Sequence, residues 1–312
     1  MEFPTFNLDE FEGLTGPARF RAADHLDMIC RESGFLVLEG HGVSPELIDD
    51  MFRVVRAFFD LPPEEKAKVA APYAGYPYGW LGPLAEALAA SKGEKTPPDL
   101  KESFNGGPLS VPEGIGDQDA YDFCYQPTLW PELEGFREVW ESYYTEMERL
   151  AARVMSAFAV ALEKPPTFFD RFIGEPISAL RALHYPPTGA RFEAGQQRAG
   201  AHTDYGSLTI LMPQAGSSGL QIQMGGMWVD VPATPGAFVV NIGDLMARWS
   251  ADRWVSTLHR VVARPNEPDR ISLAFFHQPD WEAIIEPLDG TMVYRPVRSG
   301  PYLMNKFRST SS

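Results

Sequence analysis

Apolar residues recur every three or four positions in three segments of the first half of the chain, and this spacing predicts amphipathic helices. The first segment covers 18–34 and stops at Gly34, a residue type that commonly ends helices. The second covers 44–62, where Ser44 can cap the N-terminus and a proline occupies the first helical position. The third, 132–164, is the longest, and its single apolar face indicates that it supports a sheet.

From residue 177 onward, apolar and polar residues alternate with a period of two, which predicts β-strands. The pair Gly225-Gly226 is typical of a tight hairpin turn between two of them. The strand candidates are 178–186, 207–213, 219–224, 227–232, 236–243, 257–264 and 270–277. An extended segment at 34–43 precedes the second helix, and 70–128 is rich in loops and short strands. We therefore expect a mainly β fold with supporting α-helices, built as a closed or double-sheet jelly roll.

Composition and charge narrow the classes of function. The 312 residues carry a formal net charge of −15, which argues against nucleic acid and against an anionic membrane, because both attract clustered Lys and Arg. Two cysteines, Cys30 and Cys124, are too few for a disulfide framework. The N-terminus is acidic where a signal peptide needs basic residues, and no run approaches 18 apolar residues. We expect a soluble, cytoplasmic protein that is a monomer or a weak homo-oligomer.

The stretch "AHTDYGSLTIL" places His202 and Asp204 two positions apart at the start of a strand. Side chains at this spacing in an extended chain point to the same face, so both can reach one ion. A later strand supplies His259 as a third ligand. Two histidines and one carboxylate leave open coordination positions and are typical of non-haem Fe(II) oxygenases. The pair taken alone is weak evidence, because most such pairs are surface polar residues or turn caps.

A second cluster of polar residues predicts an anion site. Arg270 and Ser272 are again two positions apart, so both share the face of Ala274 and Phe276 on one strand. An arginine beside a hydroxyl can hold a carboxylate through a forked pair of hydrogen bonds plus one neutral donor. The alternative is an internal salt bridge to one of the chain's many acids.

The motifs "GAHTDYGSLTIL", "VVNIGD", "STLHRVV" and "RISLAFF" occur in this order, with His259 following Asp204 by 55 residues and Arg270 following His259 by 11. In this order and spacing they resemble the core motifs of the Fe(II)/2-oxoglutarate-dependent dioxygenases, in the branch that includes isopenicillin N synthase. The resemblance extends over nearly the whole chain and includes "ESGFLVLEGHGV", "DLKESFNGG" and the closing "GPYLMNKFRSTSS".

The resemblance implies a fold and the roles of named residues. The fold is a double-stranded β-helix, with 1–312 as a single catalytic domain. Its parts are a mixed α/β region at 1–130, a supporting helix at 131–165, the jelly-roll core at 175–280 and a C-terminal segment at 281–312. The implied iron ligands are His202, Asp204 and His259, and the implied contacts to the distal carboxylate of 2-oxoglutarate are Arg270, Ser272 and Tyr185.

The implied reaction uses Fe(II), 2-oxoglutarate and O₂ to hydroxylate, desaturate or cyclise a small organic molecule, with release of succinate and CO₂. One alternative is an iron oxidase of the isopenicillin N synthase or ethylene-forming type, which does not use 2-oxoglutarate as an ordinary cosubstrate. Another is a catalytically silent jelly-roll binding protein. The intact metal triad and the paired Arg and Ser favour the oxygenase over the silent protein.

Some positions depart from the family or leave questions open. Leu183 stands where many plant members have a polar asparagine, so Arg181, on the same face, is a candidate for the missing cosubstrate contact. The remaining histidines are expected to be structural or solvated: His184 and His277 alternate away from the site, His41 lies in a turn and His25 on a helix. Aromatic residues and two arginines offer candidate substrate contacts: Tyr73, Tyr76, Tyr78, Trp80, Phe104, Phe276, Arg191 and Arg198.

Overall fold

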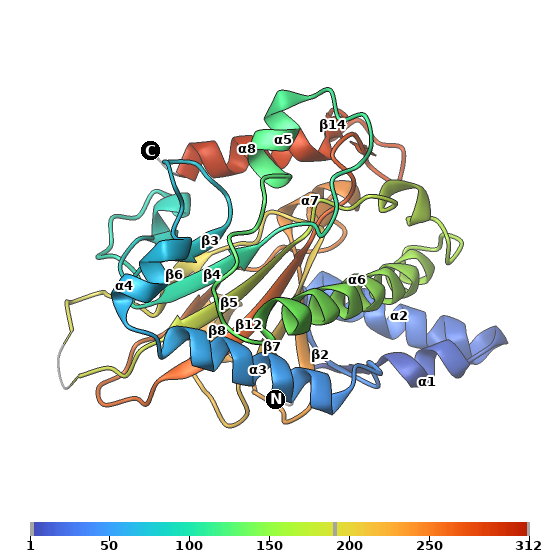
Figure 1. Cartoon of the computed structure of the whole chain (residues 1–312). Coiled ribbons are helices and arrows are strands. Elements are labelled where there is room, and N and C mark those ends of the chain that lie inside the picture. Colours follow the sequence, from blue (N-terminus) through green and yellow to red (C-terminus); the bar gives the residue numbers. More distant parts are fainter. Residues whose placement is uncertain (1–2, 190–191, 311–312) are drawn as a thin grey trace.

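Two β-sheets form the centre of the protein in the computed structural model, which describes residues 3–189 and 192–310 (Figure 1). The larger sheet has the strand order β1-β2-β10-β7-β12-β5-β4-β3, and all its pairs are antiparallel except β1 with β2. Its strands are β1 (Thr5–Asn7), β2 (Phe35–Glu39), β3 (Gly79–Leu81), β4 (Glu102–Gly106), β5 (Ala179–Tyr185), β7 (Leu208–Pro213), β10 (Phe238–Ile242) and β12 (Arg270–His277).

The smaller sheet is antiparallel and has the order β6-β11-β8-β9. Its strands are β6 (Ala199–His202), β8 (Leu220–Met224), β9 (Met227–Asp230) and β11 (His259–Val261). All seven strands predicted for the second half of the chain are present, and Gly225 and Gly226 form the expected hairpin turn with positive φ angles of 55° and 80°. The sequence missed β6, because its four residues, "AGAH", include no alternating apolar pattern.

Alternate residues of the larger sheet enter two different cores. On β12, Ile271 and Phe275 pack beneath the helices, whereas Ala274 and Phe276 pack between the two sheets. The smaller sheet adds residues such as Ile222 to this second core. Because side chains alternate strictly along a strand, positions 270 and 272 also face the space between the sheets, as the sequence predicted.

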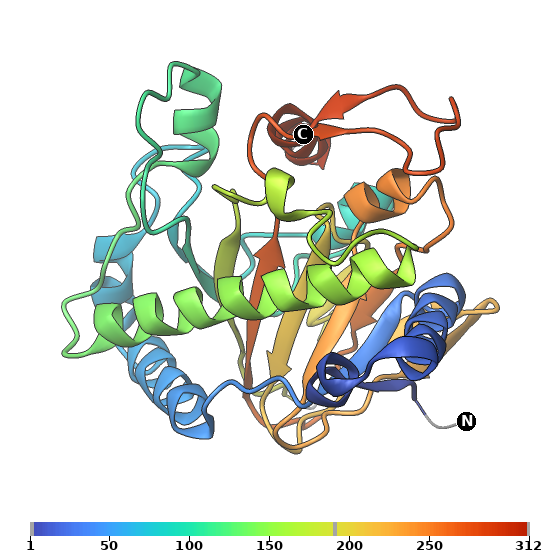
Figure 2. The same cartoon turned by 90° about the vertical axis from the view of Figure 1, so that its right-hand side faces the viewer.

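Helix α6 (Phe136–Ala161) lies across the outer face of the larger sheet (Figure 2). It begins four residues later than predicted, because Gly135, the residue before it, has a left-handed φ of 73°, which a right-handed helix cannot include. The other two predicted helices, α2 (Gly16–Glu32) and α3 (Pro45–Phe59), pack against α6. The three helices thus cover one face of the sheet and leave the other face for the site.

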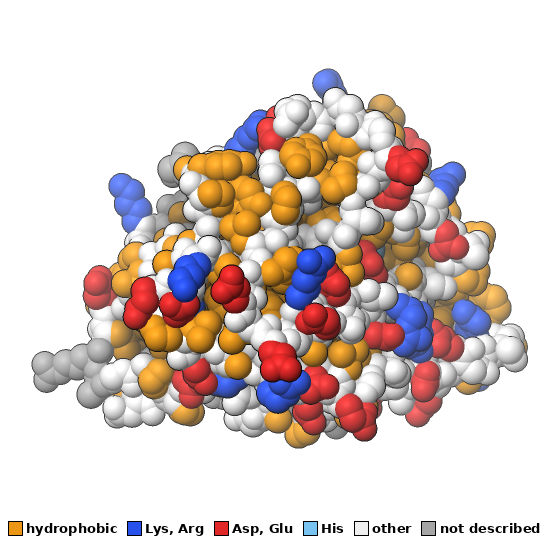
Figure 3. Space-filling view, in the orientation of Figure 1, with side chains coloured by type: hydrophobic (Ala, Val, Ile, Leu, Met, Phe, Trp, Pro, Cys, Tyr) orange, Lys and Arg blue, Asp and Glu red, His pale blue; other side chains and the backbone are white. Residues whose placement is uncertain are grey.

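The remaining helices, turns and short strands complete the fold. The turn η2 packs against β6, and α8 packs against η2. Figure 3 shows apolar side chains gathered where α5 and α8 lie, and Tyr121 on α5 and Phe307 on α8 are exposed there. These elements are α1 (Leu8–Gly13), α4 (Pro63–Lys66), η1 (Ala67–Val69), η2 (Leu88–Lys92), α5 (Gln118–Cys124), η3 (Asp170–Phe172), α7 (Asp244–Trp249), β13 (Ile284–Ile285), β14 (Val297–Arg298) and α8 (Ser299–Thr310). Among the described residues, no helix has the length and apolar character needed to cross a membrane.

Candidate metal and anion site

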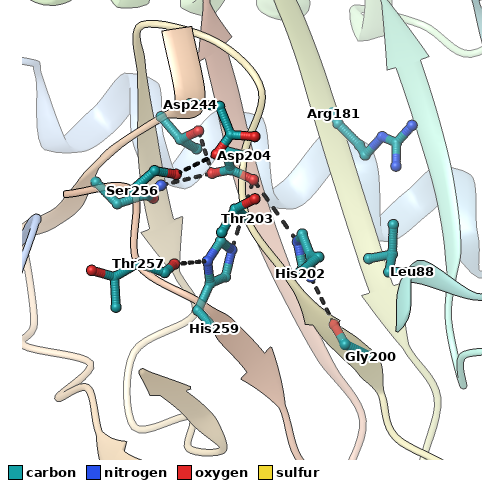
Figure 4. Close-up of polar contacts among 12 residues, drawn as sticks. Leu88, Arg181, Gly200, His202, Thr203, Asp204, Asp244, Ser256, Thr257 and His259 are labelled. Carbon is teal, nitrogen blue, oxygen red and sulfur yellow. Dashed lines mark hydrogen bonds and ion pairs between the residues drawn. The ribbon is translucent and has the colours of Figure 1, made fainter. Parts of the chain in front are cut away.

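Two histidines and an aspartate converge where β6 and β11 meet (Figure 4). His202 ends β6, His259 begins β11, and the two residues are direct partners in the antiparallel register. The Nε2 atom of His202 lies 3.8 Å from Oδ1 of Asp204, and that of His259 lies 3.7 Å from the same oxygen. The three ligand atoms all lie within 4.8 Å of one another. The fold therefore brings together the three residues that the sequence predicted as metal ligands.

Backbone carbonyls orient both imidazole rings. Nδ1 of His202 lies 2.7 Å from the carbonyl oxygen of Gly200, and Nδ1 of His259 lies 3.1 Å from that of Thr257. A carbonyl can only accept, so each Nδ1 carries the proton and each Nε2 keeps its lone pair. Burial and the charge of His259 lower the pKa of His202 to about 4, so this ring is neutral at pH 7. Both rings are thus prepared to bind a cation through Nε2.

The carboxylate of Asp204 is held by two neighbours that the sequence analysis missed. Its Oδ2 accepts hydrogen bonds from Oγ1 of Thr209 at 2.5 Å and from Nδ2 of Asn241 at 2.7 Å. These residues are register partners on β7 and β10, so the larger sheet fixes the carboxylate. Burial raises the pKa of Asp204, but the two imidazoles and these hydrogen bonds outweigh it and lower the pKa below the usual value. Oδ1 therefore remains free and negatively charged on the side of the histidines.

This donor set fits a divalent transition metal. With metal–ligand bonds of about 2.1 Å, two ligand atoms of one ion lie at most about 4.2 Å apart, and both nitrogen-to-oxygen separations fall below that limit. Imidazole suits Fe(II) and similar ions, and a carboxylate completes the facial set. The residues present thus fit the iron that the sequence motifs imply.

The predicted anion site lies between the same two sheets. Arg270 is buried, its guanidinium carbon lies 4.5 Å from the centre of the Tyr185 ring, and it pairs with Tyr185 in the register of β12 and β5. Ser272 is also buried and interacts with the Tyr185 phenol. Nη1 of Arg270 donates a long hydrogen bond of 3.4 Å to the hydroxyl of Ser217. The three residues predicted to hold a carboxylate are therefore close neighbours.

The guanidinium of Arg270 is incompletely satisfied. Its Nε is buried without a hydrogen-bond partner, and Arg270 forms no ion pair with any acid among the described residues. Burial lowers the pKa of Arg270 from its usual value because water is excluded from the charge. A buried cation in this condition is costly unless an anion completes it. The alternative of an internal salt bridge is therefore not realised, and the site fits a carboxylate ligand.

Arg181 has a partner of its own. Its Nη1 donates to both carboxylate oxygens of Glu86, at 3.3 and 3.2 Å. Burial alone would raise the pKa of the Glu86 carboxyl, but the positive charges of Arg181 and Lys101 outweigh it and lower this pKa to about 2. Arg181 lies four residues before Tyr185 on β5, a separation of about 13 Å along the strand. The structure thus assigns Arg181 to an ion pair near η2 and away from the carboxylate contacts of Arg270.

The other histidines behave as the sequence predicted. Nδ1 of His184 lies 2.8 Å from Glu102, and His277 hydrogen-bonds a buried serine hydroxyl at 2.8 Å, so neither belongs to the metal cluster. His41 accepts the backbone N–H of Val43 and stabilises its turn, and His25 is exposed.

Several candidate substrate contacts prove to be structural. Phe104 is fully buried in the core beneath the helices, and Tyr78 is buried with its hydroxyl donated to the carbonyl of Cys124. Arg198 is buried and donates to the carbonyl of Pro268 at 2.6 Å, so it supports the chain. Arg191 lies outside the described residues.

Two family profiles match this chain. Residues 176–279 match the 2OG-Fe(II) oxygenase superfamily, and residues 3–133 match the non-haem dioxygenase in morphine synthesis N-terminal family. The first match contains all the metal and anion residues described above. The second match runs from β1 to α5 and includes both η2 and β4.

Characterised relatives and solved structures agree with these matches. The chain is 34% identical over 297 residues to 2-oxoglutarate-dependent dioxygenase caaD of Aspergillus niger, and the alignment covers 91% of this chain and 86% of the relative. It is 32% identical over 313 residues to homoarginine-6-hydroxylase 2-ODD-C23.1 of Arabidopsis thaliana, covering 91% and 88%. The crystal structure of a full-length Neurospora crassa protein in complex with alpha-KG and thymine superposes with a TM-score of 0.85 at 29% identity, covering 99% of this chain and 97% of that one.

Proposed function

Because the chain belongs to the 2-oxoglutarate–Fe(II) oxygenase superfamily, we propose that His202, Asp204 and His259 are its iron ligands. The protein is a 2-oxoglutarate-dependent dioxygenase with a jelly-roll fold, an oxidoreductase that uses Fe(II), 2-oxoglutarate and O₂. The predicted family, fold, enzyme class and cofactors are thus confirmed. The observation that supports the ligand assignment is the convergence of the three ligand atoms within 4.8 Å, with both Nε2 lone pairs aimed inward.

We further propose that Arg270, Ser272 and Tyr185 bind the distal carboxylate of 2-oxoglutarate. The buried Nε of Arg270, which has no partner among the described residues, supports this role, because a carboxylate would supply the missing acceptor. The Ser272 and Tyr185 hydroxyls can add neutral hydrogen bonds to the same group. Iron bound at the triad would supply the redox chemistry that couples decarboxylation of the cosubstrate to attack on a C–H bond.

The primary substrate that we propose is a small polar organic molecule, and the reaction is its hydroxylation. The Arg181–Glu86 pair, which lies at the η2 end of the sheets, can present one donor and one acceptor to such a molecule. The relatives support small substrates, because one is named for homoarginine and another holds thymine. Desaturation and ring closure remain alternatives that use the same site.

Four other assignments rest on the sequence and are part of the proposal. We propose that 1–312 works as a single catalytic domain, that it is a monomer or a weak homo-oligomer, that nucleic acids and membranes are not its partners, and that it is cytoplasmic. The net charge of −15 supports the exclusion of nucleic acids and anionic membranes, and the two buried free thiols, Cys30 and Cys124, support a reducing compartment such as the cytoplasm. Light scattering after size-exclusion chromatography would test the oligomeric state.

Anaerobic titration with Fe(II) and then 2-oxoglutarate tests the assignment. We expect the weak visible charge-transfer band of an iron–2-oxoglutarate chelate to appear on the second addition. His202→Ala should lose metal binding, whereas Arg270→Ala should keep the metal and lose the response to 2-oxoglutarate. Equal loss of metal in both variants would contradict these roles. Bound iron that never yields the band would contradict the roles proposed for Arg270, Ser272 and Tyr185.

A further inference from the structure

The strand that carries His202 has one unpaired edge. Strand β6 lies at the edge of the smaller sheet and pairs only with β11 among the described strands. At Gly200, a side chain takes the place of a neighbouring strand: the backbone N–H donates to Oδ1 of Asp99 at 2.9 Å. The carbonyl of the same glycine accepts from Nδ1 of His202 at 2.7 Å (Figure 4). Gly200 therefore stands directly between Asp99 and the ring of a metal ligand.

Asp99 holds a second element with its other oxygen. Oδ2 accepts the backbone N–H of Leu88, the first residue of η2, at 3.1 Å. The side chain is buried at 1% exposure, so water does not compete for these two bonds. At the far end of η2, Nζ of Lys92 donates to Oγ1 of Thr203 at 2.7 Å. The turn η2 is thus tied to the Gly200–Asp204 segment at both of its ends, at one end through Asp99 and at the other directly.

Close packing leaves no substitute for glycine at this point. A Cβ built on Gly200 would lie 2.8 Å from the backbone nitrogen of Ala89 and 3.0 Å from its Cβ. Glycine is also the residue with the greatest backbone freedom, so its N–H and carbonyl planes keep their directions only if each is held. Asp99 holds the first plane, and without it the carbonyl that orients His202 can rotate.

We propose that Asp99 is a positioning residue for the metal site: it orients His202 through Gly200 and couples that orientation to the docking of η2. The proposal rests on the proposed role of His202 as a metal ligand. It assigns a purpose to Asp99 in the motif "DLKESFNGG". Nζ of Lys101 lies 3.8 Å from Oδ2 of Asp99 and pairs more closely with Glu86, and Glu102 pairs with Lys66. An acid at this position acts on the metal without touching it, because partners that orient a ligating histidine tune its affinity for metal.

Anaerobic titration of the full chain with Co(II), followed by calorimetry and by the visible spectrum of the bound ion, tests this proposal. Asp99→Ala removes both hydrogen bonds, and we expect Co(II) to bind about tenfold more weakly with an altered ligand-field spectrum. Asp99→Asn keeps one acceptor oxygen, which can serve only one of the two N–H groups. We expect its Co(II) affinity to lie between those of the wild type and the alanine variant.

The chain offers a matched control in Asp280. Its carboxylate likewise accepts two backbone N–H groups, from Glu175 at 2.7 Å and Gly174 at 3.3 Å, but neither residue adjoins a metal ligand. Asp280→Ala should lower the melting temperature and leave the Co(II) affinity and spectrum unchanged. A role of Asp99 in stability alone would make the two alanine variants indistinguishable in metal binding.

The possible outcomes distinguish the positioning role of Asp99 from the metal-ligand role of His202 on which it rests. A wild-type protein that does not bind Co(II) would contradict the metal site itself. If the wild type binds and a folded Asp99→Ala variant binds equally well with the same spectrum, only the role of Asp99 is overturned. Should the alanine variant fail to fold, a folded Asp99→Asn variant with wild-type affinity and spectrum overturns it in the same way.

Discussion

Replacing Arg270 with methionine should stabilise the protein without ligands and abolish its response to 2-oxoglutarate. The buried Nε without a partner among the described residues costs about 1–3 kcal/mol, and the substitution removes it. Loss of the contact with the Tyr185 ring costs up to about 2 kcal/mol, and a methionine sulfur against that ring restores about 0.3–1.5 kcal/mol. We expect a net gain of about 1 kcal/mol. At about 2.1 cal/mol/K per residue, the unfolding entropy of 312 residues converts this gain into about 1.5 °C.

The loss of binding should be much larger than the gain in stability. Two charge-assisted hydrogen bonds of about 1.5–3 kcal/mol each would disappear, so the affinity for 2-oxoglutarate should fall by at least about 100-fold. With Mn(II) present and 2-oxoglutarate at about 100 times its dissociation constant, the wild type should gain about 2.7 kcal/mol, or about 4 °C. The variant should gain less than about 1 °C under the same conditions. Differential scanning fluorimetry measures both shifts.

Arg198 provides the matched control, because it is also buried and its Nε likewise has no hydrogen-bond partner among the described residues, whereas both of its Nη atoms have partners. Its Nη2 donates to the carbonyls of Pro268 and Pro186, and Nη1 lies 3.6 Å from Glu267. Arg198→Met should therefore lower the melting temperature of the ligand-free protein. The reasoning about Arg270 is refuted if Arg270→Met loses as much stability as the control, or if it keeps the shift caused by 2-oxoglutarate.

Three further substitutions test other contacts. Asn241→Leu removes one charge-assisted hydrogen bond from the metal-site carboxylate and should weaken Co(II) binding about 10- to 100-fold by calorimetry, whereas the equally buried Asn105→Leu should not. Burial raises the pKa of Glu148 to about 7, so the folded state holds this proton more tightly than the unfolded chain, and stability falls as the pH rises from about 4.5 through 7. Glu148→Gln should remove this contribution. The melting temperature of the variant minus that of the wild type should therefore increase across the same pH interval, and parallel pH profiles would contradict this. Glu102→Gln leaves the buried ammonium of Lys66 without its carboxylate and should cost about 3–5 kcal/mol, or about 5–8 °C, while a drop below about 2 °C would show that the pair contributes little.

The strength of the sequence signals explains how much of the fold and site could be predicted. The two polar residues at the start of β12 stand two positions apart, so the shared face of Arg270 and Ser272 followed from the period of a strand. Strand β6 has only four residues and no alternation, so its existence could not be predicted even though it carries His202. Side chains at positions i and i+2 share a face in any extended segment, so the common face of His202 and Asp204 could be predicted although β6 itself could not.

The supports of the metal site illustrate the limit of local reasoning. Asn241 is a polar residue in an otherwise apolar strand, a signal that could have marked it as functional, but nothing local says which group it meets. Asp99 precedes Gly200 by 101 residues along the chain and reaches it only because the loop with η2 packs on the free edge of β6. The burial of Phe104 in the core could not be predicted either, because this residue lies in a loop-rich region of the sequence.

By itself, the sequence determined the chemistry of the site, because residue type and short-range spacing decide which side chains can share a face and which ligand they suit. The pairs His202 with Asp204 and Arg270 with Ser272 were predicted from that information, whereas His259 was added from a later strand and from the order of the family motifs. The tertiary structure alone decided how those groups are held: Oδ2 of the aspartate by two strands, a histidine by a glycine carbonyl, and Arg181 by an acid from a distant loop. Hydrogen bonds between distant segments depend on how the sheets and loops pack, and no local pattern in the chain encodes that packing.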